Sequence, residues 1–218
     1  WQGEVWEKSA SDKLVPMFVK VNLVSSDEEK DEFDMVLTLS DLSNVKEMER
    51  LEHLAHHDAL TGLANRAQLY KVMDEVVSSS NYASQQFAVI YLDLDGFKHV
   101  NDNYGHDAGD AILKEVSNRL LSQVRAGDLV ARLSGDEFVL IIKQTNKVML
   151  AKLAERLLTL IGQTVHHKQR SLNVGASLGI HLVDNSEHDI DAILKIADEA
   201  MYHAKHQGKG QFVFSSDV

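Results

Sequence analysis

From Asp58 to the end of the chain, apolar residues change repeatedly between helical and strand spacing. Stripes with apolar residues every three or four positions predict helices that follow Asn65 and cover 107–124, 147–161 and 190–206. Apolar runs bounded by turn residues predict strands at 87–94, 129–133, 138–142, 172–183 and 211–215. The core order is β-α-β-β-α-β, which predicts an α/β (α+β) domain with a central sheet flanked by helices.

Residues 1–42 carry a different pattern, which predicts strands. Met17, Val19, Val21 and Leu23 alternate with polar residues and fall on one face. A charged turn follows, and 35–43 predicts a further strand. These strands are too few to build a good hydrophobic core on their own.

Residues 43–57 return to helical spacing, with Val45, Met48 and Leu51 separated by charged residues. This pattern fits an amphipathic connector that forms a short coiled coil, and it equally fits a surface helix packed on its own domain. We therefore divide the chain into an N-terminal β fragment (1–42), a helical connector (43–57) and a main domain (58–218).

Composition narrows the class of protein. The 218 residues are 44% hydrophobic and 25% charged, as in a soluble globular protein. No apolar run approaches the roughly 20 residues of a membrane span, so we expect no membrane segment in this chain. A formal charge of −11 argues against binding a nucleic-acid polymer, but it allows a small phosphate ligand held by local cations.

The cysteine content and the first residue lead to an expectation about cellular location. The chain has no cysteine, which fits a reducing cytoplasm, and it opens without Met. We expect a cytoplasmic fragment of a protein that other segments could attach to a membrane.

The candidate chemistry begins with two acidic stretches. "RLSGDEF" places Asp136 and Glu137 in a tight turn, and the strand "FAVIYLDLD" ends in Asp93 and Asp95. If the two strands are neighbours, three or four carboxylates converge, and a hard cation such as Mg²⁺ would relieve their repulsion. Mg²⁺ on a triphosphate would indicate phosphoryl transfer. The alternative is that Asp95 and Asp136 are solvated turn residues.

Further motifs make the pattern specific. "DALTGLANR", "DLDGFKHVNDNYGHDAGD", "SGDEF" and "ADEAMYHAKHQGKG" together resemble the GGDEF domain of diguanylate cyclases, over residues 58–214. The resemblance implies a palm-like βαββαβ fold, as in nucleotide cyclases and polymerases. It also implies condensation of two GTP into cyclic di-GMP and two pyrophosphates.

The resemblance assigns the metal-binding and nucleotide-binding residues. Asp93 and Glu137 would ligate Mg²⁺, for which Mn²⁺ can substitute, together with the carbonyl of Leu94. Asp136 would be a further metal ligand or the proton acceptor for the 3′-hydroxyl. Residues matching positions that bind GTP are Phe97, Lys98, Asn101, Asp110, Gly135, Lys205 and Lys209.

Asn101 and Asp110 match the guanine readers of the family. A carboxylate can accept both guanine N1–H and N2–H, which adenine does not offer. Without the resemblance, they would be a loop asparagine and a carboxylate in the first turn of a helix.

Two other regions resemble regulatory parts. Arg125 and Asp128 match the family's RxxD product-inhibition site for cyclic di-GMP, and Arg156 matches a position that completes it. An RxxD tetrapeptide alone would usually be a surface ion pair. Residues 1–42 resemble the C-terminal part of a PAS-like sensor domain.

Ser134 departs from the family's Gly-Gly-Asp-Glu-Phe signature. If position 134 needs a positive φ, serine costs about 1 kcal/mol or more, and in ordinary β geometry it is tolerated. We expect an active enzyme, working at full or reduced rate as a homodimer that brings two GTP sites together. The alternatives are a non-catalytic receptor for cyclic di-GMP or GTP, and a pure dimerisation module.

Overall fold

The computed structural model describes residues 1–9, 11–27, 32–78, 86–184 and 187–218. Contacts between residues divide the chain into two units, Trp1–Ala55 and His56–Val218.

The first unit is a small antiparallel sheet followed by a helix. Strands β1 (Gln2–Lys8), β2 (Leu14–Asp27) and β3 (Glu32–Asp41) pair in that order, and α1 (Ser43–His56) follows them. All residues of α1 are described and none is buried, and Trp6 and Leu39 are also exposed. The expectation of a weak core in the N-terminal β fragment is therefore met. Part of the predicted charged turn, 28–31, lies outside the described residues, and the PAS-like assignment stays a prediction.

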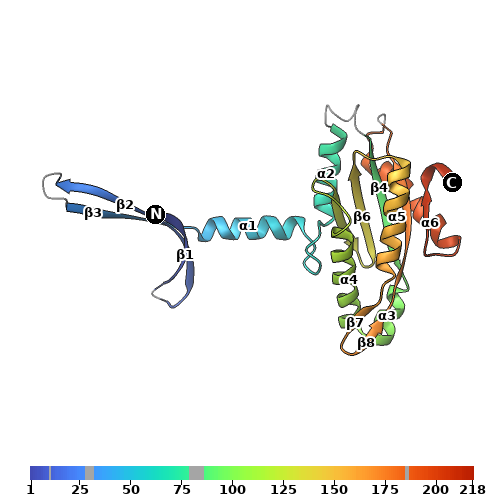
Figure 1. Cartoon of the computed structure of the whole chain (residues 1–218), viewed down its shortest axis with the longest axis horizontal. Coiled ribbons are helices and arrows are strands. Elements are labelled where there is room, and N and C mark those ends of the chain that lie inside the picture. Colours follow the sequence, from blue (N-terminus) through green and yellow to red (C-terminus); the bar gives the residue numbers. More distant parts are fainter. Residues whose placement is uncertain (10, 28–31, 79–85, 185–186) are drawn as a thin grey trace. The chain divides into compact units, whose positions relative to one another are not determined.

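The second unit is a five-stranded sheet with helices on both faces (Figure 1). Its strand order is β10-β9-β4-β6-β5, with β10 parallel to β9 and the other neighbours antiparallel. The helices are α2 (Arg66–Ser78), α3 (Phe97–Tyr104), α4 (His106–Leu121), α5 (Lys147–Ile161) and α6 (Ile190–His206). The strands of the sheet are β4 (Phe87–Asp95), β5 (Leu129–Ser134), β6 (Glu137–Lys143), β9 (Gly175–Leu182) and β10 (Phe212–Phe214). The short 3-10 helix η2 (Ser215–Asp217) follows β10.

Strand β4 is the centre of the core, and it is buried on both faces. Ile90 and Leu92 belong to a cluster that includes residues of α4 and α5, whereas Val89 and Tyr91 belong to a cluster that includes residues of α2 and α6. Alternate residues of a strand point to opposite faces, so a fully apolar run is required here. The run "FAVIYL" meets this requirement, and the predicted fold class is confirmed.

The structure corrects two predictions about elements. The apolar run at 172–183 is not one strand, because β8 (Arg170–Leu172) pairs with β7 (Val165–His167) in a separate hairpin, and β9 begins only at Gly175. Helix α3 was not predicted, since its eight residues bury only Phe97 and Val100, too few for a recognisable stripe.

The β5–β6 hairpin carries the acidic turn. Ser134 pairs with Glu137, which leaves Gly135 and Asp136 as the loop. Gly135 has a φ of +49°, the left-handed conformation that glycine adopts at little cost. Ser134 is the last residue of β5, directly after a register shift between Arg132 and Ser134, and its φ is not positive.

The side chain of Arg132 holds this turn in place. Arg132 donates from Nε and Nη2 to the carbonyl of Gly135, at 3.1 and 2.9 Å, and from Nη1 to Asp58 Oδ1 at 2.9 Å. Asp58 also accepts from the backbone and hydroxyl of Thr61. The turn is thereby tied to the "DALTGLANR" segment, 74 residues earlier in the chain.

Helix α6 packs unusually closely on β9. A Cβ added to Gly179 would overlap the carbonyl oxygen of Ala197 and the amide nitrogen of Met201, both of them backbone atoms of α6. Only a residue without a side chain allows this approach.

We predict that Gly179→Ala lowers the free energy of unfolding by about 3 kcal/mol or more, because the backbone of α6 must move away from the sheet. Urea denaturation followed by circular dichroism measures this loss. Gly162→Ala is the control: Gly162 caps α5 at a φ of −67°. We expect the control to change the stability by less than about 1 kcal/mol. Equal stability of both variants would contradict the close approach.

A second prediction concerns the anchor of the turn. Burial favours a raised pKa for Asp58, but hydrogen bonds from Thr61 and Arg132 outweigh it and lower the pKa. We expect Asp58→Asn to lower the free energy of unfolding at neutral pH by about 1–3 kcal/mol. The wild-type advantage is complete above the unfolded-state pKa of about 3.9 and is lost as the pH falls through the lower folded-state pKa.

Denaturation of both proteins across this pH range tests the prediction. Asp107→Asn is the control, since the pair of Asp107 with Lys168 is exposed to solvent and should contribute little to stability. A difference between wild type and Asp58→Asn that persists unchanged in acid would refute the assignment.

Candidate active site

The two acidic stretches meet at one end of the sheet. Asp93 on β4 lies directly opposite Glu137 on β6 in the antiparallel register. The amide of Leu94 donates to the carbonyl of Asp136 at 3.2 Å, which joins the turn to the end of β4. The condition set by the sequence, that the two strands be neighbours, is therefore met.

Asp93 is a buried carboxylate with a lysine ammonium group beside it. Asp93 is 9% exposed, and Nζ of Lys205, in the last turn of α6, lies 2.7 Å from its Oδ2. Burial raises the pKa of Asp93; the carboxylates of Asp136 and Asp95 act in the same direction, and Lys205 opposes them. The position therefore favours a nearby positive charge.

Asp95 has a different role from the one expected. It accepts from the hydroxyl of Ser177, at 3.1 and 2.9 Å, and from the amide of Gly210 at 3.1 Å. These contacts hold the loop after α6, which includes Lys209, against the end of β4. Asp95 is thus a structural anchor for that loop, and neither of the sequence alternatives described it.

Glu137 has a hydrogen-bond partner that was not predicted, and a buried tyrosine lies on the neighbouring strand. Ser134 Oγ donates to Glu137 Oε2 at 3.2 Å. Tyr91 precedes Asp93 by two residues on the same face of β4. Burial, followed by the charges of Glu137 and Asp198, raises the pKa of Tyr91 to about 12. The spacing of Tyr91 from Asp93 was the one available sequence signal for it.

The donor set fits a hard divalent cation. Within the described part of the chain, no three His, Asp or Glu side chains form a ready-made metal cluster. Asp93 and Glu137 nevertheless supply carboxylate oxygens from adjacent strands, and Asp93 is buried. Mg²⁺ typically binds through one or two carboxylates plus substrate phosphates, so two carboxylates suffice.

The predicted guanine readers come from two adjoining helices. Asn101 lies on α3, and its Oδ1 is buried without a hydrogen-bond partner among the described residues. A side chain at Gly109 of α4 would overlap this oxygen. Asp110 is exposed on the next position of α4. An acceptor that lacks a partner and an exposed carboxylate suit a ligand with hydrogen-bond donors.

The remaining residues predicted to bind GTP divide by exposure. Phe97 is buried at the start of α3, where it supports the loop after β4, and Lys98 beside it is exposed. Lys209 is also exposed and has a φ of +63°.

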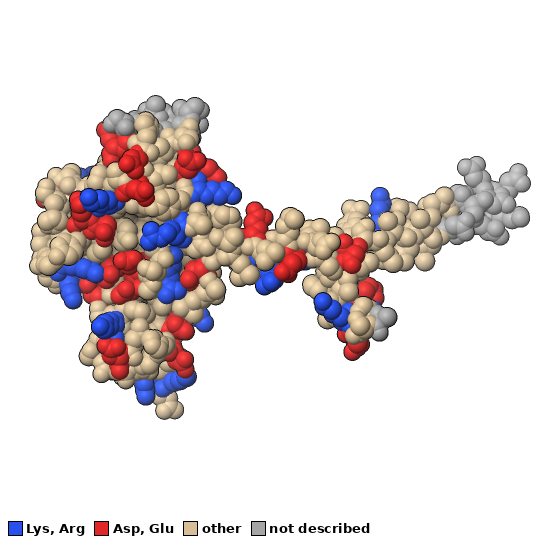
Figure 2. Space-filling model, turned by 180° about the vertical axis from the view of Figure 1, so that it is seen from behind, with Lys and Arg blue, Asp and Glu red and all other residues tan. Residues whose placement is uncertain are grey.

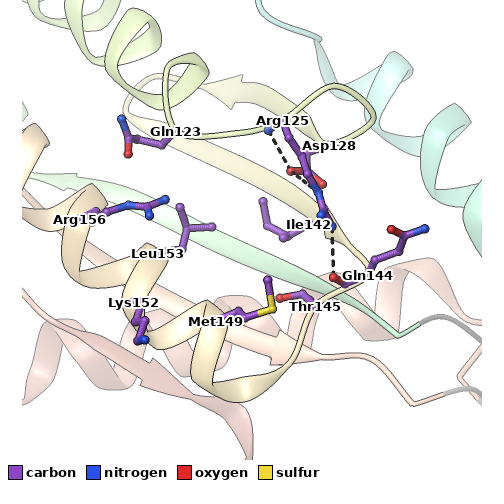
Figure 3. Close-up of a pocket in the computed structure, with 10 residues that line it drawn as sticks. All are labelled: Gln123, Arg125, Asp128, Ile142, Gln144, Thr145, Met149, Lys152, Leu153 and Arg156. Atoms are coloured by element: carbon purple, nitrogen blue, oxygen red, sulfur yellow. Dashed lines mark hydrogen bonds and ion pairs between the residues drawn. The ribbon is translucent and has the colours of Figure 1, made fainter.

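The RxxD residues line a separate pocket of about 290 Å³ (Figure 3). Asp128 Oδ1 accepts from the amide of Lys143 at 3.0 Å, and Asp128 Oδ2 accepts from the amide of Arg125 at 3.1 Å. Arg125 donates to the carbonyls of Lys143 and Gln144, yet its side chain is 52% exposed. Arg156, on α5, lines the same pocket, and its role in completing a cyclic di-GMP site stays a prediction.

Two further observations concern the charges on the surface and the apolarity of the helices. Figure 2 shows basic and acidic side chains interspersed over the visible face of the second unit. Among the residues that are described, no helix is long and apolar enough to cross a membrane.

Comparison with known proteins places this geometry in a family. The family model "Diguanylate cyclase, GGDEF domain" matches residues 55–211. The bifunctional diguanylate cyclase/cyclic di-GMP phosphodiesterase MucR of Pseudomonas aeruginosa is 42% identical over 164 residues. That match covers 75% of this chain and 24% of MucR, so the chain spans about a quarter of that relative.

Solved structures agree. The GGDEF domain of TpbB (YfiN) from Pseudomonas aeruginosa has a TM-score of 0.70 and 33% identity, covering 73% of this chain and 94% of that one. A microbial GGDEF domain, from a study of its interaction with cyclic di-GMP, has a TM-score of 0.66 and 26% identity, covering 75% and 99%. The residues that meet at the end of β4, and a family model that spans most of the chain, show that this protein belongs to the GGDEF diguanylate cyclase family.

Proposed function

We propose that this protein is an active diguanylate cyclase, which condenses two GTP into cyclic di-GMP and two pyrophosphates. The observation that carries the proposal is the pairing of Asp93 with Glu137 beside the Gly135 turn. Carboxylates opposite each other at the mouth of a sheet suit phosphoryl transfer, because the substrate brings its own phosphate ligands for the metal.

Each residue has a role in this proposal. Asp93 and Glu137 hold Mg²⁺, or Mn²⁺ in its place, with the carbonyl of Leu94. GGDEF cyclases generally use a divalent metal, which supplies positive charge to the phosphates when bound. Asp136 is a third ligand or the group that accepts the proton of the attacking 3′-hydroxyl.

The chain's own cations and amides bind the rest of GTP. Lys205 and Lys209 bind phosphate oxygens at the end of α6, and Lys98 reaches them from α3. Asp110 accepts hydrogen bonds from guanine N1–H and N2–H, which adenine does not offer, and Asn101 is the second residue that reads guanine.

A homodimer completes the reaction. One domain provides one GTP site, so the 3′-hydroxyl of one nucleotide must reach the α-phosphorus of another that a second copy holds. A twofold arrangement presents the two sites to each other and makes the attack effectively intramolecular.

A second function is favoured by the pocket at Arg125, Asp128 and Arg156. A half-exposed guanidinium beside a buried carboxylate is suited to phosphate and guanine, because its planar fork both hydrogen-bonds and stacks. This pocket would bind cyclic di-GMP as an inhibitory product. In a chain without turnover, it would make the domain a receptor.

The direct test is incubation of the purified protein with GTP and Mg²⁺, with products separated by chromatography. We expect cyclic di-GMP and pyrophosphate. Absence of product at protein concentrations that favour dimers would overturn the enzyme proposal, and binding of cyclic di-GMP would then identify a receptor.

We predict that Glu137→Gln reduces kcat by about 10²-fold or more, because it removes a metal-binding charge and keeps the shape of the side chain. Initial rates of cyclic di-GMP formation measure the effect. Glu75→Gln on the exposed side of α2 is the control and should leave kcat unchanged. Near-normal turnover in Glu137→Gln would refute its role as a metal ligand.

We predict that Arg125→Ala raises the cyclic di-GMP concentration needed for half-inhibition by about tenfold or more, since a charged hydrogen-bonding partner of phosphate is lost. The initial rate without added product should stay the same, because Arg125 lies outside the acidic turn. Lys195→Ala, at an exposed position on α6, tests the loss of surface charge alone. Unaltered inhibition in Arg125→Ala would exclude this pocket as the inhibitory site.

A further inference from the structure

Ser134 makes a contact that glycine at this position could not make. Its backbone is extended and the positive φ of the turn belongs to Gly135, so the serine introduces no backbone strain. Its hydroxyl donates to Glu137 Oε2 at 3.2 Å, across the last pair of the hairpin. The departure from the family signature thus adds a hydrogen-bond donor beside a carboxylate of the site.

The serine donor differs in kind from the partner of Asp93. Lys205 brings a full positive charge to Asp93, whereas the hydroxyl of Ser134 is neutral. A neutral donor orients a carboxylate and leaves its negative charge available to a cation. Hydrogen-bond partners of metal ligands act in this way, and their removal typically weakens metal binding by 10–100-fold, on the order of magnitude seen in metal sites generally.

We propose that Ser134 is a positioning residue that orders the Glu137 carboxylate for the divalent cation. The inference rests on the proposed function insofar as Glu137 is taken as a metal ligand. The serine of this chain accordingly strengthens metal binding relative to a glycine at the same position.

The test measures binding of Mn²⁺ directly, by electron paramagnetic resonance, in the presence of a GTP analogue with a methylene bridge between the α- and β-phosphorus atoms. We expect Ser134→Ala and Ser134→Gly to weaken Mn²⁺ binding by about tenfold. Ser134→Thr, which keeps the hydroxyl, should bind like the wild type.

The controls separate positioning from a general loss of structure. Ser171→Ala removes an exposed serine hydroxyl from the β7–β8 hairpin and should leave Mn²⁺ binding unchanged. The Tm of metal-free Ser134→Ala and Ser134→Thr should stay close to that of the wild type, and Ser134→Gly should lower it slightly because glycine destabilises a strand. Equal Mn²⁺ affinity in wild type, Ser134→Ala and Ser134→Gly would overturn the inference, as would an equal loss in Ser171→Ala.

The results of the Mn²⁺-binding test can be separated from the results of the test for cyclic di-GMP formation. If Ser134→Ala weakens Mn²⁺ binding in a protein that makes no cyclic di-GMP, the positioning role stands and the enzyme proposal fails. If product forms while Mn²⁺ binding is the same in all variants, the enzyme proposal stands and the positioning role is overturned. A wild type that binds no Mn²⁺ would overturn the role of Ser134 and the metal assignment together.

Discussion

The site depends on the burial of one carboxylate at the end of the central strand. Asp93 follows six apolar residues of β4 and is itself largely withdrawn from water. A buried carboxylate is costly unless a positive charge accompanies it. The ammonium of Lys205 meets this need from α6, and a divalent cation would meet it in the same place. The chemistry of the site is thus a consequence of where the sheet ends.

The antiparallel pairing of β4 with β6 places Glu137 opposite the buried carboxylate of Asp93. A shift of one residue would turn Glu137 to the opposite face, so register and site are fixed by the same apolar residues. Arg132 then holds the turn by bonding the Gly135 carbonyl and Asp58 together. The segment that opens the domain is in this way a structural support of the acidic turn.

The sequence predicted the elements with long apolar stripes and missed those without them. Helices α5 and α6 begin and end where their stripes predict, because each buries residues along its whole length. The missed elements, α3 and the β7–β8 hairpin, have few apolar residues, and the hairpin turns at Lys168 and Gln169 with positive φ at both. Such turns usually contain glycine or asparagine, so no local signal marked this one.

The site was predictable to the extent that motifs carry it. The pairing of Asp93 with Glu137 followed from the hairpin and the strand end, whereas the anchoring of Asp95 by Ser177 depends on a strand 82 residues away. Tyr91 was missed because a tyrosine in an apolar strand is ordinarily a core residue.

Ser134 shows that the backbone conformation required at each position explains a sequence signature better than residue identity alone. The turn needs one residue with positive φ, and Gly135 provides it, so position 134 is free to vary as the last residue of a strand. A side chain there points toward its cross-strand partner, and that partner is Glu137. A residue at 134 can therefore affect Glu137 directly, as the hydroxyl of Ser134 does at 3.2 Å.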